Sequence, residues 1–239
     1  MDFFTMQEKP NRVLIKVSGE ALAGKVGFGL DNDKIARIAS DISILYKMDI
    51  EICLVIGGGN ILRGSELSSV GFVRTTADYM GMIATIINAL ALQNAIEKSN
   101  IVCRVLSSIP ITAVCEPYIK RRAVRHMEKK RIVIFAAGTG NPFFSTDTAA
   151  VLRAIETDCN ILIKATQVDG VYSSDPKKNS NAERFKKVSY DELLSKNLKV
   201  MDAAAIALAK DNNIPIMVCK LDEILNVING NGLYTLIKN

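Results

Sequence analysis

Short apolar runs alternate with amphipathic helical patterns along almost the whole chain. Runs rich in Val, Ile, Leu and Cys predict buried strands at 12–18, 51–56, 101–106, 131–136, 160–164 and 214–219, and an edge strand that closes the sheet at 234–237. Helical spacing of apolar residues predicts helices at 31–48, 75–98, 145–158, 190–196, 202–212 and 222–229, and a basic helix lies within 120–131. This alternation predicts an α/β fold in which helices on both faces sandwich a mostly parallel central sheet.

Two segments depart from the simple alternation. The helix at 75–98 has apolar positions on most of its faces, so we expect it between layers or at a subunit contact. Thr75 is expected to cap it, with Asp78 placed as in a capping box. The polar segment 167–187 predicts an excursion or a small hairpin. No linker divides the chain, so we expect one domain over 1–239, with the part to about residue 150 and the remainder as two lobes of one sheet.

The composition is that of a folded protein with a large core. Of the 239 residues, 49% are hydrophobic, which excludes a wholly disordered chain. The net charge of +5 is too modest to predict a nucleic-acid partner, and the basic residues of 120–131 are expected to form a solvated helix face. Because no apolar run of about 18 residues is free of charge, no membrane partner is expected. Residues 1–10 lack the apolar core of a signal peptide.

The cysteines and the single histidine restrict the possible chemistry. None of the five cysteines belongs to a C-x-x-C pair, so buried, reduced thiols and a cytoplasmic location are expected. His126, in the basic helix, is expected at the surface or an interface, which gives no support to a Ser-His-Asp triad or a histidine-bound zinc. The chain also lacks the P-loop motif and the G-x-G-x-x-G motif of dinucleotide-binding enzymes.

The most informative segment is Gly57-Gly58-Gly59-Asn60, which follows directly on a predicted buried strand. Glycine allows the backbone to approach a ligand closely and to adopt positive φ without steric cost. Backbone N–H groups exposed where a strand leads into a helix bind anions, above all phosphate. Phosphate binding is therefore the leading hypothesis.

Three other predicted strand ends resemble this one. They read Lys16-Val17-Ser18-Gly19, Ala137-Gly138-Thr139-Gly140-Asn141-Pro142 and Lys164-Ala165-Thr166. Because the carboxyl ends of parallel strands meet at one edge of a sheet, these segments are expected to converge there and to hold two phosphorylated ligands end to end. Lys16 lies inside an apolar strand, where an unpaired ammonium group is costly, so a functional role is expected for it.

Three acidic or hydroxyl residues near this edge allow two interpretations. Ser145 and Asp147 could bind a ligand or could only cap the helix at 145–158. Asp78 could likewise be only an acidic residue in a first helical turn. The residues themselves do not decide between these roles.

Several motifs together resemble those of the bacterial UMP kinases, members of the amino-acid kinase superfamily. They are K-V-S-G-E-A-L, V-I-G-G-G-N-I-L-R-G, D-Y-M-G-M, G-T-G-N-P-F-F-S-T-D, A-T-Q-V-D-G-V-Y-S-S-D-P and K-V-M-D-A-A-A, in the order seen in that family. The resemblance extends from about Arg12 to the C-terminus. It implies the amino-acid kinase fold, in which the part to about residue 150 mainly binds UMP and the remainder mainly binds ATP.

The resemblance also implies a reaction and its residues. ATP and UMP would give ADP and UDP, in pyrimidine biosynthesis, with Mg²⁺ carried by ATP and no metal ligand assigned to the protein. The implied catalytic residues are Lys16, Arg63 and Asp202. The implied ATP-binding residues are Lys16, Val17, Ser18, Gly19, Gly59, Arg63, Thr166, Tyr172 and Asp175. The implied UMP-binding residues are Gly58, Asp78, Thr139, Gly140, Asn141, Pro142, Phe143, Phe144, Ser145 and Thr146.

The same resemblance implies a homohexamer, inhibition by UTP and activation by GTP. The segment linked with that activation is Gly24, Lys25, Val26, Gly27, Phe28 and Gly29. One departure is Gln167, where relatives usually carry Lys or Asn, and it affects the expected local ATP contacts. Two alternatives stay open: a superfamily kinase with an amino-acid or carbamate acceptor, and a nucleotide-sensing regulator without turnover.

Overall fold

A nine-stranded sheet forms the centre of the computed structural model, which describes residues 10–62, 71–176, 178–179, 181–198 and 200–239. The strand order is β4-β3-β5-β2-β1-β6-β8-β9-β7. Every neighbouring pair is parallel except β8 and β9. The strands are β1 (Arg12–Val17), β2 (Glu51–Ile56), β3 (Cys103–Ser107), β4 (Glu116–Pro117), β5 (Ile132–Ala136), β6 (Ile161–Thr166), β7 (Lys187–Val188), β8 (Ile216–Lys220) and β9 (Tyr234–Ile237).

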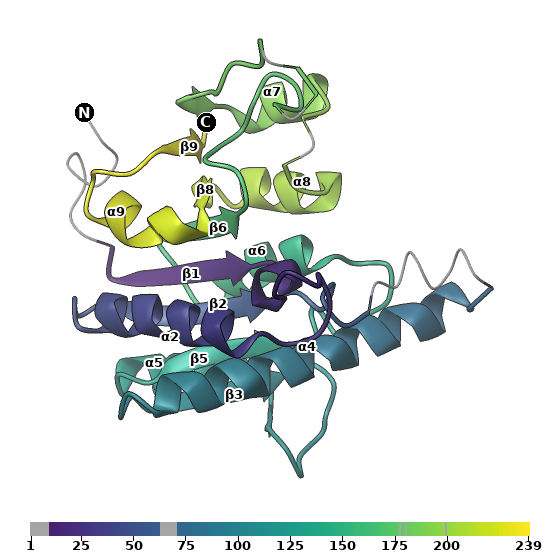
Figure 1. Ribbon diagram of the computed structural model, residues 1–239, viewed down its shortest axis with the longest axis vertical. Helices are drawn as coiled ribbons and strands as arrows, with labels where there is room; N and C mark the ends of the chain where they lie inside the picture. The colour runs from purple at the N-terminus through teal and green to yellow at the C-terminus, as the bar shows by residue number, and fades with distance from the viewer. Residues whose placement is uncertain (1–9, 63–70, 177, 180, 199) are drawn as a thin grey trace.

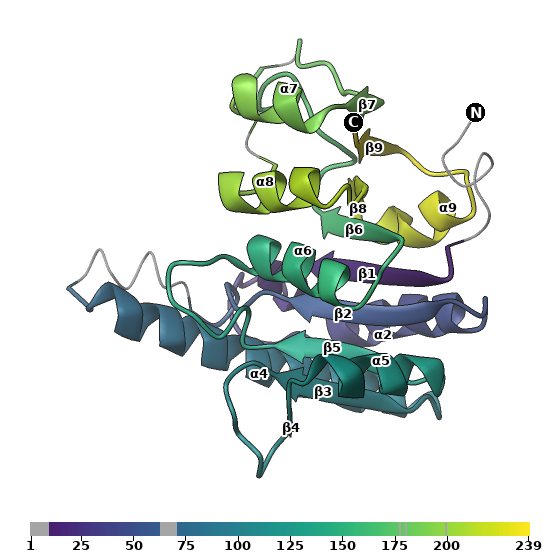
Figure 2. The same ribbon diagram turned by 180° about the vertical axis from the view of Figure 1, so that it is seen from behind.

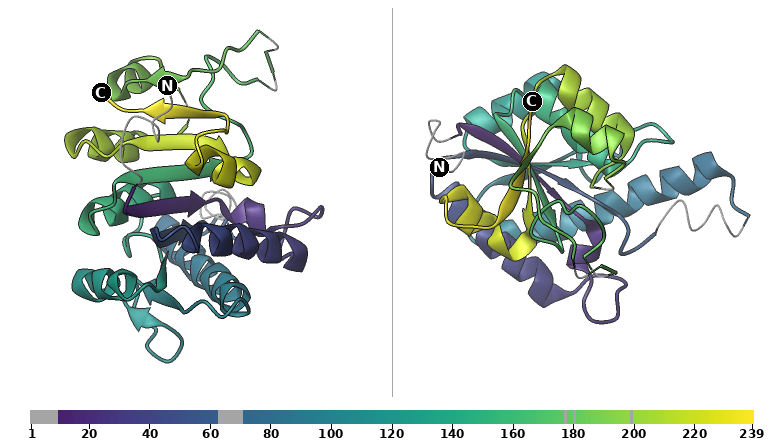
Figure 3. Two further views of the ribbon diagram at one scale, coloured as in Figure 1. Left: turned by 90° about the vertical axis from the view of Figure 1, so that its left-hand side faces the viewer. Right: turned by 90° about the horizontal axis from the view of Figure 1, so that it is seen from above.

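Helices cover both faces of this sheet, which confirms the predicted α/β class. The helices are η1 (Gly19–Leu22), α2 (Asn32–Tyr46), α4 (Arg74–Glu97), α5 (Lys120–Glu128), α6 (Thr146–Glu156), α7 (Tyr190–Ser195), α8 (Ala203–Asp211), η2 (Leu221–Glu223) and α9 (Ile224–Ile228). Helices α2, α4 and α9 lie on one face (Figure 1), and α5, α6 and α8 lie on the other (Figure 2). Seen from above, the strands fan around a common centre between these two layers (Figure 3).

Two apolar cores follow from the alternation of side chains along the central strand. Val13, Ile15 and Val17 of β1 point into the core beneath α2 and α4, whereas Leu14 points into the core beneath α6 and α8. Because β1 is buried on both faces, it reads as a continuous apolar run rather than as an alternating pattern. Lys16, in phase with Leu14, is therefore directed to the α6 side at the carboxyl end of the strand.

Two predictions about local structure are wrong in detail. Helix α4 begins at Arg74 after Val73, with no side-chain cap, so Thr75 and Asp78 form no capping box. Strand β9 lies between β8 and the short strand β7, so β9 is not an edge. His126 is partly buried, with its ring nitrogens 3.2 Å from a Glu116 carboxylate oxygen and 3.2 Å from an Arg131 nitrogen, and its place at a surface or an interface stays a prediction.

Helix α4 is the one helix of the described residues that is long and apolar enough to cross a membrane, by length and composition only. Its buried residues, among them Ala84, Ala89 and Leu92, belong to the face that packs on α2 and the sheet. A core helix of a layered fold has this same composition, so the finding gives little support to a membrane partner.

The cysteines are free, as predicted, and all but the partly exposed Cys115 are buried. Burial raises the pKa of Cys103 and of Cys219 to about 12. A thiol with so high a pKa carries almost no thiolate at neutral pH. These two cysteines therefore pack as small apolar side chains.

Candidate active site

The four predicted strand ends meet along one edge of the sheet, because β5, β2, β1 and β6 are neighbours and run parallel. The loops after β1 and β2 are in direct contact. The Gly57 N–H donates to the Val17 carbonyl at 3.0 Å. A Cβ atom on Gly19 would lie 2.7 Å from the Gly57 oxygen and 2.7 Å from the Gly59 nitrogen. Only glycine at position 19 allows this close approach of two backbones.

Two buried lysines and one aspartate form the charged centre of this edge. Lys16 and Lys164 are paired residues of the neighbouring strands β1 and β6. Asp147, in the first turn of α6, lies between them, with its two oxygens 2.8 Å from the Lys16 Nζ and 2.5 Å from the Lys164 Nζ. Lys16 is only 7% exposed and Lys164 only 9%. A single carboxylate thus holds two ammonium groups side by side, leaving a net positive charge.

The protonation of this cluster follows from burial and charge together. Burial by itself would raise the pKa of Asp147, but the ammonium groups of Lys16 and Lys164 outweigh it and lower that pKa. The pKa of Lys164 is lowered by burial, which the nearby Asp147 carboxylate only partly offsets. The carboxylate is therefore ionised at neutral pH, and Lys164 is easier to deprotonate than an exposed lysine.

Asp202 connects the N-termini of two helices beside this cluster. It caps α8 by accepting from the Ala205 N–H at 2.9 Å. It also accepts from the Thr148 hydroxyl at 2.8 Å and from the Ser145 hydroxyl. Ser145 in turn caps α6 by accepting from the N–H groups of Asp147 and Thr148. Capping therefore does occur here, and it brings the positive ends of two helix dipoles to the edge where an anion would bind.

The loop from Ala137 to Ser145 lies against the N-terminal half of α4. The Phe143 N–H donates to the Asp78 carboxylate at 2.8 Å, and Arg74 holds the same carboxylate at 2.9 Å. The Ala137 N–H donates to the Thr85 hydroxyl at 2.7 Å. Asp78 is thus more than a first-turn acid, since it fixes a loop that lies far away in the sequence.

Gly58 packs on the same helix. A Cβ atom on Gly58 would lie 2.7 Å from the Gly81 carbonyl oxygen of α4. The glycine run, α4 and the loop from Ala137 to Ser145 therefore form one continuous surface. The exposed side chains of Phe143 and Phe144 extend from it.

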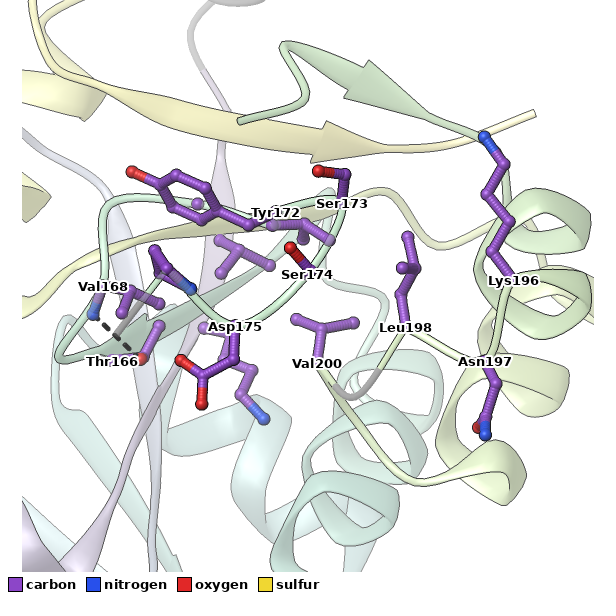
Figure 4. A pocket seen from close by; sticks show the side chains of 15 residues that line it. Thr166, Val168, Tyr172, Ser173, Ser174, Asp175, Lys196, Asn197, Leu198 and Val200 are labelled. Atoms are coloured by element: carbon purple, nitrogen blue, oxygen red, sulfur yellow. Dashed lines mark hydrogen bonds between the residues drawn. The ribbon is translucent and has the colours of Figure 1, made fainter. Parts of the chain in front are cut away.

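A cavity of about 480 Å³ opens on the other side of the lysine cluster. Lys164 of the cluster lines it, together with Thr166, Tyr172 and Asp175, and the last three are seen in Figure 4. Much of the remaining lining is apolar and suits a flat ring: Val168, Val171, Leu198, Val200 and Val218. The three ATP-binding residues that the sequence analysis placed in the C-terminal part thus surround one cavity.

Gln167 lies elsewhere. It lines a separate cavity of about 300 Å³ on the α2 side, together with Ser18 and Lys220. The side chain at this position is therefore not among those that line the larger cavity. The departure from the usual Lys or Asn concerns the smaller cavity.

One predicted site residue lies outside the described residues, and the sequence does not single out two residues of the charged centre. Arg63, expected to bind phosphate, falls outside the described residues. The sequence allows two interpretations of Asp147 and indicates Lys164 only as part of a strand end. The available signal was a lysine inside each of two apolar strands, since buried ammonium groups require a counter-ion. Within the described residues, no group of three or more His, Cys, Asp or Glu side chains could hold a metal ion.

The chain is similar to known proteins over almost its whole length. The family model described as the amino acid kinase family matches residues 11–220. A uridylate kinase of Ehrlichia ruminantium is 57% identical over 235 residues, 97% of this chain and 96% of that protein. A uridylate kinase of Wolbachia from Brugia malayi is 54% identical over 233 residues, 97% and 95% of the two chains. The crystal structure of a UMP kinase from Bacillus anthracis superimposes with a TM-score of 0.93 at 42% identity, over 97% of both chains.

Proposed function

The chain belongs to the amino acid kinase family, and we propose that it transfers the γ-phosphoryl group of ATP to UMP, giving ADP and UDP in pyrimidine biosynthesis. The activity is that of a UMP kinase, a phosphotransferase whose acceptor is a phosphate group. The observation that carries the proposal within the structure is the Lys16–Asp147–Lys164 cluster. It lies between the loop assigned to UMP and the cavity assigned to ATP.

The chemistry requires positioning and charge neutralisation rather than a strong base. A phosphate oxygen of UMP is already ionised near neutral pH, so it can attack without losing a proton to the protein. Its difficulty is the approach of one anion to another. Lys16 and Lys164 supply fixed positive charge where the two anions meet, and the N-termini of α6 and α8 add to it. Asp147 holds both ammonium groups in place, and Asp202 fixes the two helix ends.

We assign the ATP phosphates to the loops after β1 and β2, with Val17, Ser18, Gly19 and Gly59, together with Arg63. The nucleoside part of ATP occupies the cavity of Thr166, Tyr172 and Asp175. Its apolar lining matches an adenine ring, and the polar residues that also line it match a ribose. Both ATP assignments adjoin the same lysine cluster, which aligns the γ-phosphoryl group with the acceptor.

Mg²⁺ is proposed as a cofactor that arrives with ATP. Phosphate oxygens would supply most of its ligands, and the carboxylates of Asp147 and Asp202, at and beside the lysine cluster, could supply further hard oxygen donors. When bound, the ion would neutralise phosphate charge.

We assign UMP to Gly58, Asp78 and the loop from Thr139 to Thr146. Asp78→Asn should raise KM for UMP about tenfold while KM for ATP stays within about twofold, because a charged hydrogen-bond acceptor contributes about 1.5 kcal/mol or more. The Asp78 carboxylate can accept from a ribose diol, and it already holds the Phe143 N–H. Steady-state kinetics with each substrate varied in turn measures the change in KM for UMP and the change in KM for ATP. Asp33→Asn, in the first turn of α2, is the matched control; equal changes in both KM values would contradict the assignment.

The acceptor assay tests the function directly. ADP release from ATP and Mg²⁺ is followed with UMP, CMP, glutamate, aspartate or carbamate as acceptor. Turnover with UMP is the expected result. Turnover with glutamate, aspartate or carbamate instead would favour another kinase of the superfamily, and turnover with none would favour a regulator.

A cytoplasmic location is proposed. We also propose that GTP activates the enzyme and that UTP inhibits it. The segment Gly24 to Gly29 forms a loop whose Val26 and Phe28 side chains are exposed. The end of this loop at Gly29 is hydrogen-bonded to Asn60, which follows the glycine run. The Gly29 N–H donates to the Asn60 carbonyl, and the Asn60 side chain donates to the Gly29 carbonyl, both at 2.8 Å. An effector that moves this loop would therefore act on the phosphate-binding glycines.

A homohexamer is proposed, with α4 in one of its contacts. The exposed residues Tyr79, Ile83 and Ile87 recur every fourth position and form an apolar stripe on α4. The N-terminal part of this helix extends beyond the sheet (Figure 1). Ile83→Glu should therefore shift the assembly to a smaller species in sedimentation or light scattering, because a charge would be buried in the contact. Ile44→Glu on α2, at an equally exposed apolar position, is the control; an unchanged mass for Ile83→Glu would exclude α4 from the contact.

A further inference from the structure

We propose that Ser108 and Arg153 are positioning residues for UMP: they hold the peptide between Gly138 and Thr139 so that the Thr139 N–H faces the substrate. The inference rests on the proposed function, which assigns UMP to the loop that begins at Thr139. Ser108 follows the carboxyl end of β3, and Arg153 lies on α6. Neither residue belongs to the surface that the substrates are proposed to contact.

The direction of the contacts is set by the chemistry of the groups. The Ser108 Oγ lies 2.8 Å from the Gly138 carbonyl oxygen and 2.8 Å from the Arg153 Nη2. A guanidinium group can only donate and a carbonyl oxygen can only accept. The serine hydroxyl therefore accepts from Arg153 and directs its single hydrogen at Gly138.

Because the peptide is planar, the hydrogen bond from Ser108 to the Gly138 carbonyl also fixes the direction of the Thr139 N–H. The C=O and the N–H of one trans peptide point in opposite directions. Because the Gly138 carbonyl is directed at Ser108, the N–H of the same peptide, which belongs to Thr139, points away from Ser108. Within the described residues, the N–H groups of Gly138 and Thr139 donate to no acceptor, whereas the Gly140 N–H donates to Ala137 at 2.9 Å. Two donors are thus left for a ligand.

The turn needs such support because its backbone is strained. Ala137 has φ of 61°, in the left-handed region that costs a residue with a Cβ atom about 1 kcal/mol or more. Gly138 and Gly140 also have positive φ, of 56° and 83°. Side-chain hydrogen bonds from two other elements hold this turn, one between Ala137 and Thr85 and one between Gly138 and Ser108.

Arg153 is itself fixed by its surroundings. It is only 4% exposed, its guanidinium lies 3.7 Å from the centre of the Tyr118 ring, and it pairs with Glu156. The Tyr118 hydroxyl donates to the same Glu156 carboxylate at 2.5 Å. Since α6 also carries Asp147, one helix holds both the lysine cluster and, through Arg153, the turn that begins the acceptor loop.

Ser108→Ala tests the proposal without removing a buried charge. UMP binding is measured by calorimetry, and both KM values are measured by steady-state kinetics. We expect Kd and KM for UMP to rise about three- to tenfold, the loss expected for one intramolecular hydrogen bond, with KM for ATP changed less than about twofold. Ser107→Ala is the matched control, because the neighbouring hydroxyl donates to the Ile109 carbonyl and not to the turn. It should leave UMP binding within about twofold.

Arg153→Met tests whether the hydrogen bond from Arg153 orients the Ser108 hydroxyl. Thermal denaturation establishes that the variant is folded. Because both substitutions act through the same peptide, the Ser108→Ala/Arg153→Met pair should weaken UMP binding by less than the product of the two single effects. UMP binding by Ser108→Ala equal to that of the unaltered chain, or equal rises in KM for UMP and ATP, overturns the proposal. Failure of the unaltered chain to use UMP would instead overturn the proposed function, so the two failures are distinguishable.

Discussion

Lys16→Met should lower kcat about 100-fold or more while the protein stays folded. The Lys16 ammonium is buried at the meeting point of the two proposed substrates, where a preorganised donor stabilises the transition state most strongly. Methionine preserves most of the volume of the side chain, and Asp147 keeps Lys164 as its partner. No charge is therefore left unpaired by the substitution. Steady-state kinetics with ATP and UMP, together with a thermal denaturation curve, measures both parts of the expectation.

The matched control is Lys47→Met, which removes an exposed lysine at the end of α2. It should leave kcat within about twofold. Near-normal turnover by Lys16→Met would remove Lys16 from the catalytic role and would leave Lys164 as the remaining candidate.

Asp147→Asn should lower both stability and activity, and for a different reason. It leaves two buried ammonium groups side by side with no ion-pair partner among the described residues. Removing one partner of a buried ion pair typically costs about 3–5 kcal/mol. We therefore expect a loss of about 3 kcal/mol in denaturant unfolding. ATP should stabilise the variant more than the unaltered chain, because its phosphates replace the lost negative charge.

The pH dependence of this variant has a definite sign. In the unaltered chain the pKa of Asp147 is lowered. The ionised carboxylate therefore adds to the free energy of unfolding at neutral pH, and this stabilisation is lost as the pH falls through the lowered pKa. Without the carboxylate, the pKa of Lys164 should fall further, since Asp147 opposes the effect of burial more strongly than Asp202 does. A folded-state lysine pKa below its unfolded value makes stability rise with pH, so the deficit of the variant should shrink between pH 7 and pH 9.

Asp191→Asn is the control for Asp147→Asn. Asp191 is also in a first helical turn and also pairs with a lysine, Lys210, but it is mostly exposed. Its loss should cost no more than about 1 kcal/mol. Equal effects of the two substitutions would show that the buried cluster has no special electrostatic role.

The strands and most helices could be predicted because local patterns decide them. The predicted strand at 51–56 coincides with β2, and Asp31, Ser145 and Asp202, where three predicted helices begin, are the residues that cap those helices. Both errors arise because a partner far away in the sequence decides the local structure. The proposed capping box failed because the Asp78 carboxylate binds the Phe143 N–H, a partner far away in the sequence. Strand β9 is not an edge because the two-residue strand β7 pairs with it, and a strand so short leaves no pattern.

By itself the sequence determined the class of fold, the glycine-rich turns and the presence of lysines inside apolar strands, since each of these depends on residues within a few positions of one another. Only the tertiary structure decided which carboxylate neutralises Lys16 and Lys164, and which buried side chains support the turn before Thr139. Those pairings depend on the order of strands in the sheet, which brings β1 beside β6 and sets α6 across them. Electrostatic and hydrogen-bond partners act over a few ångströms in space, and distance along the chain does not reveal them.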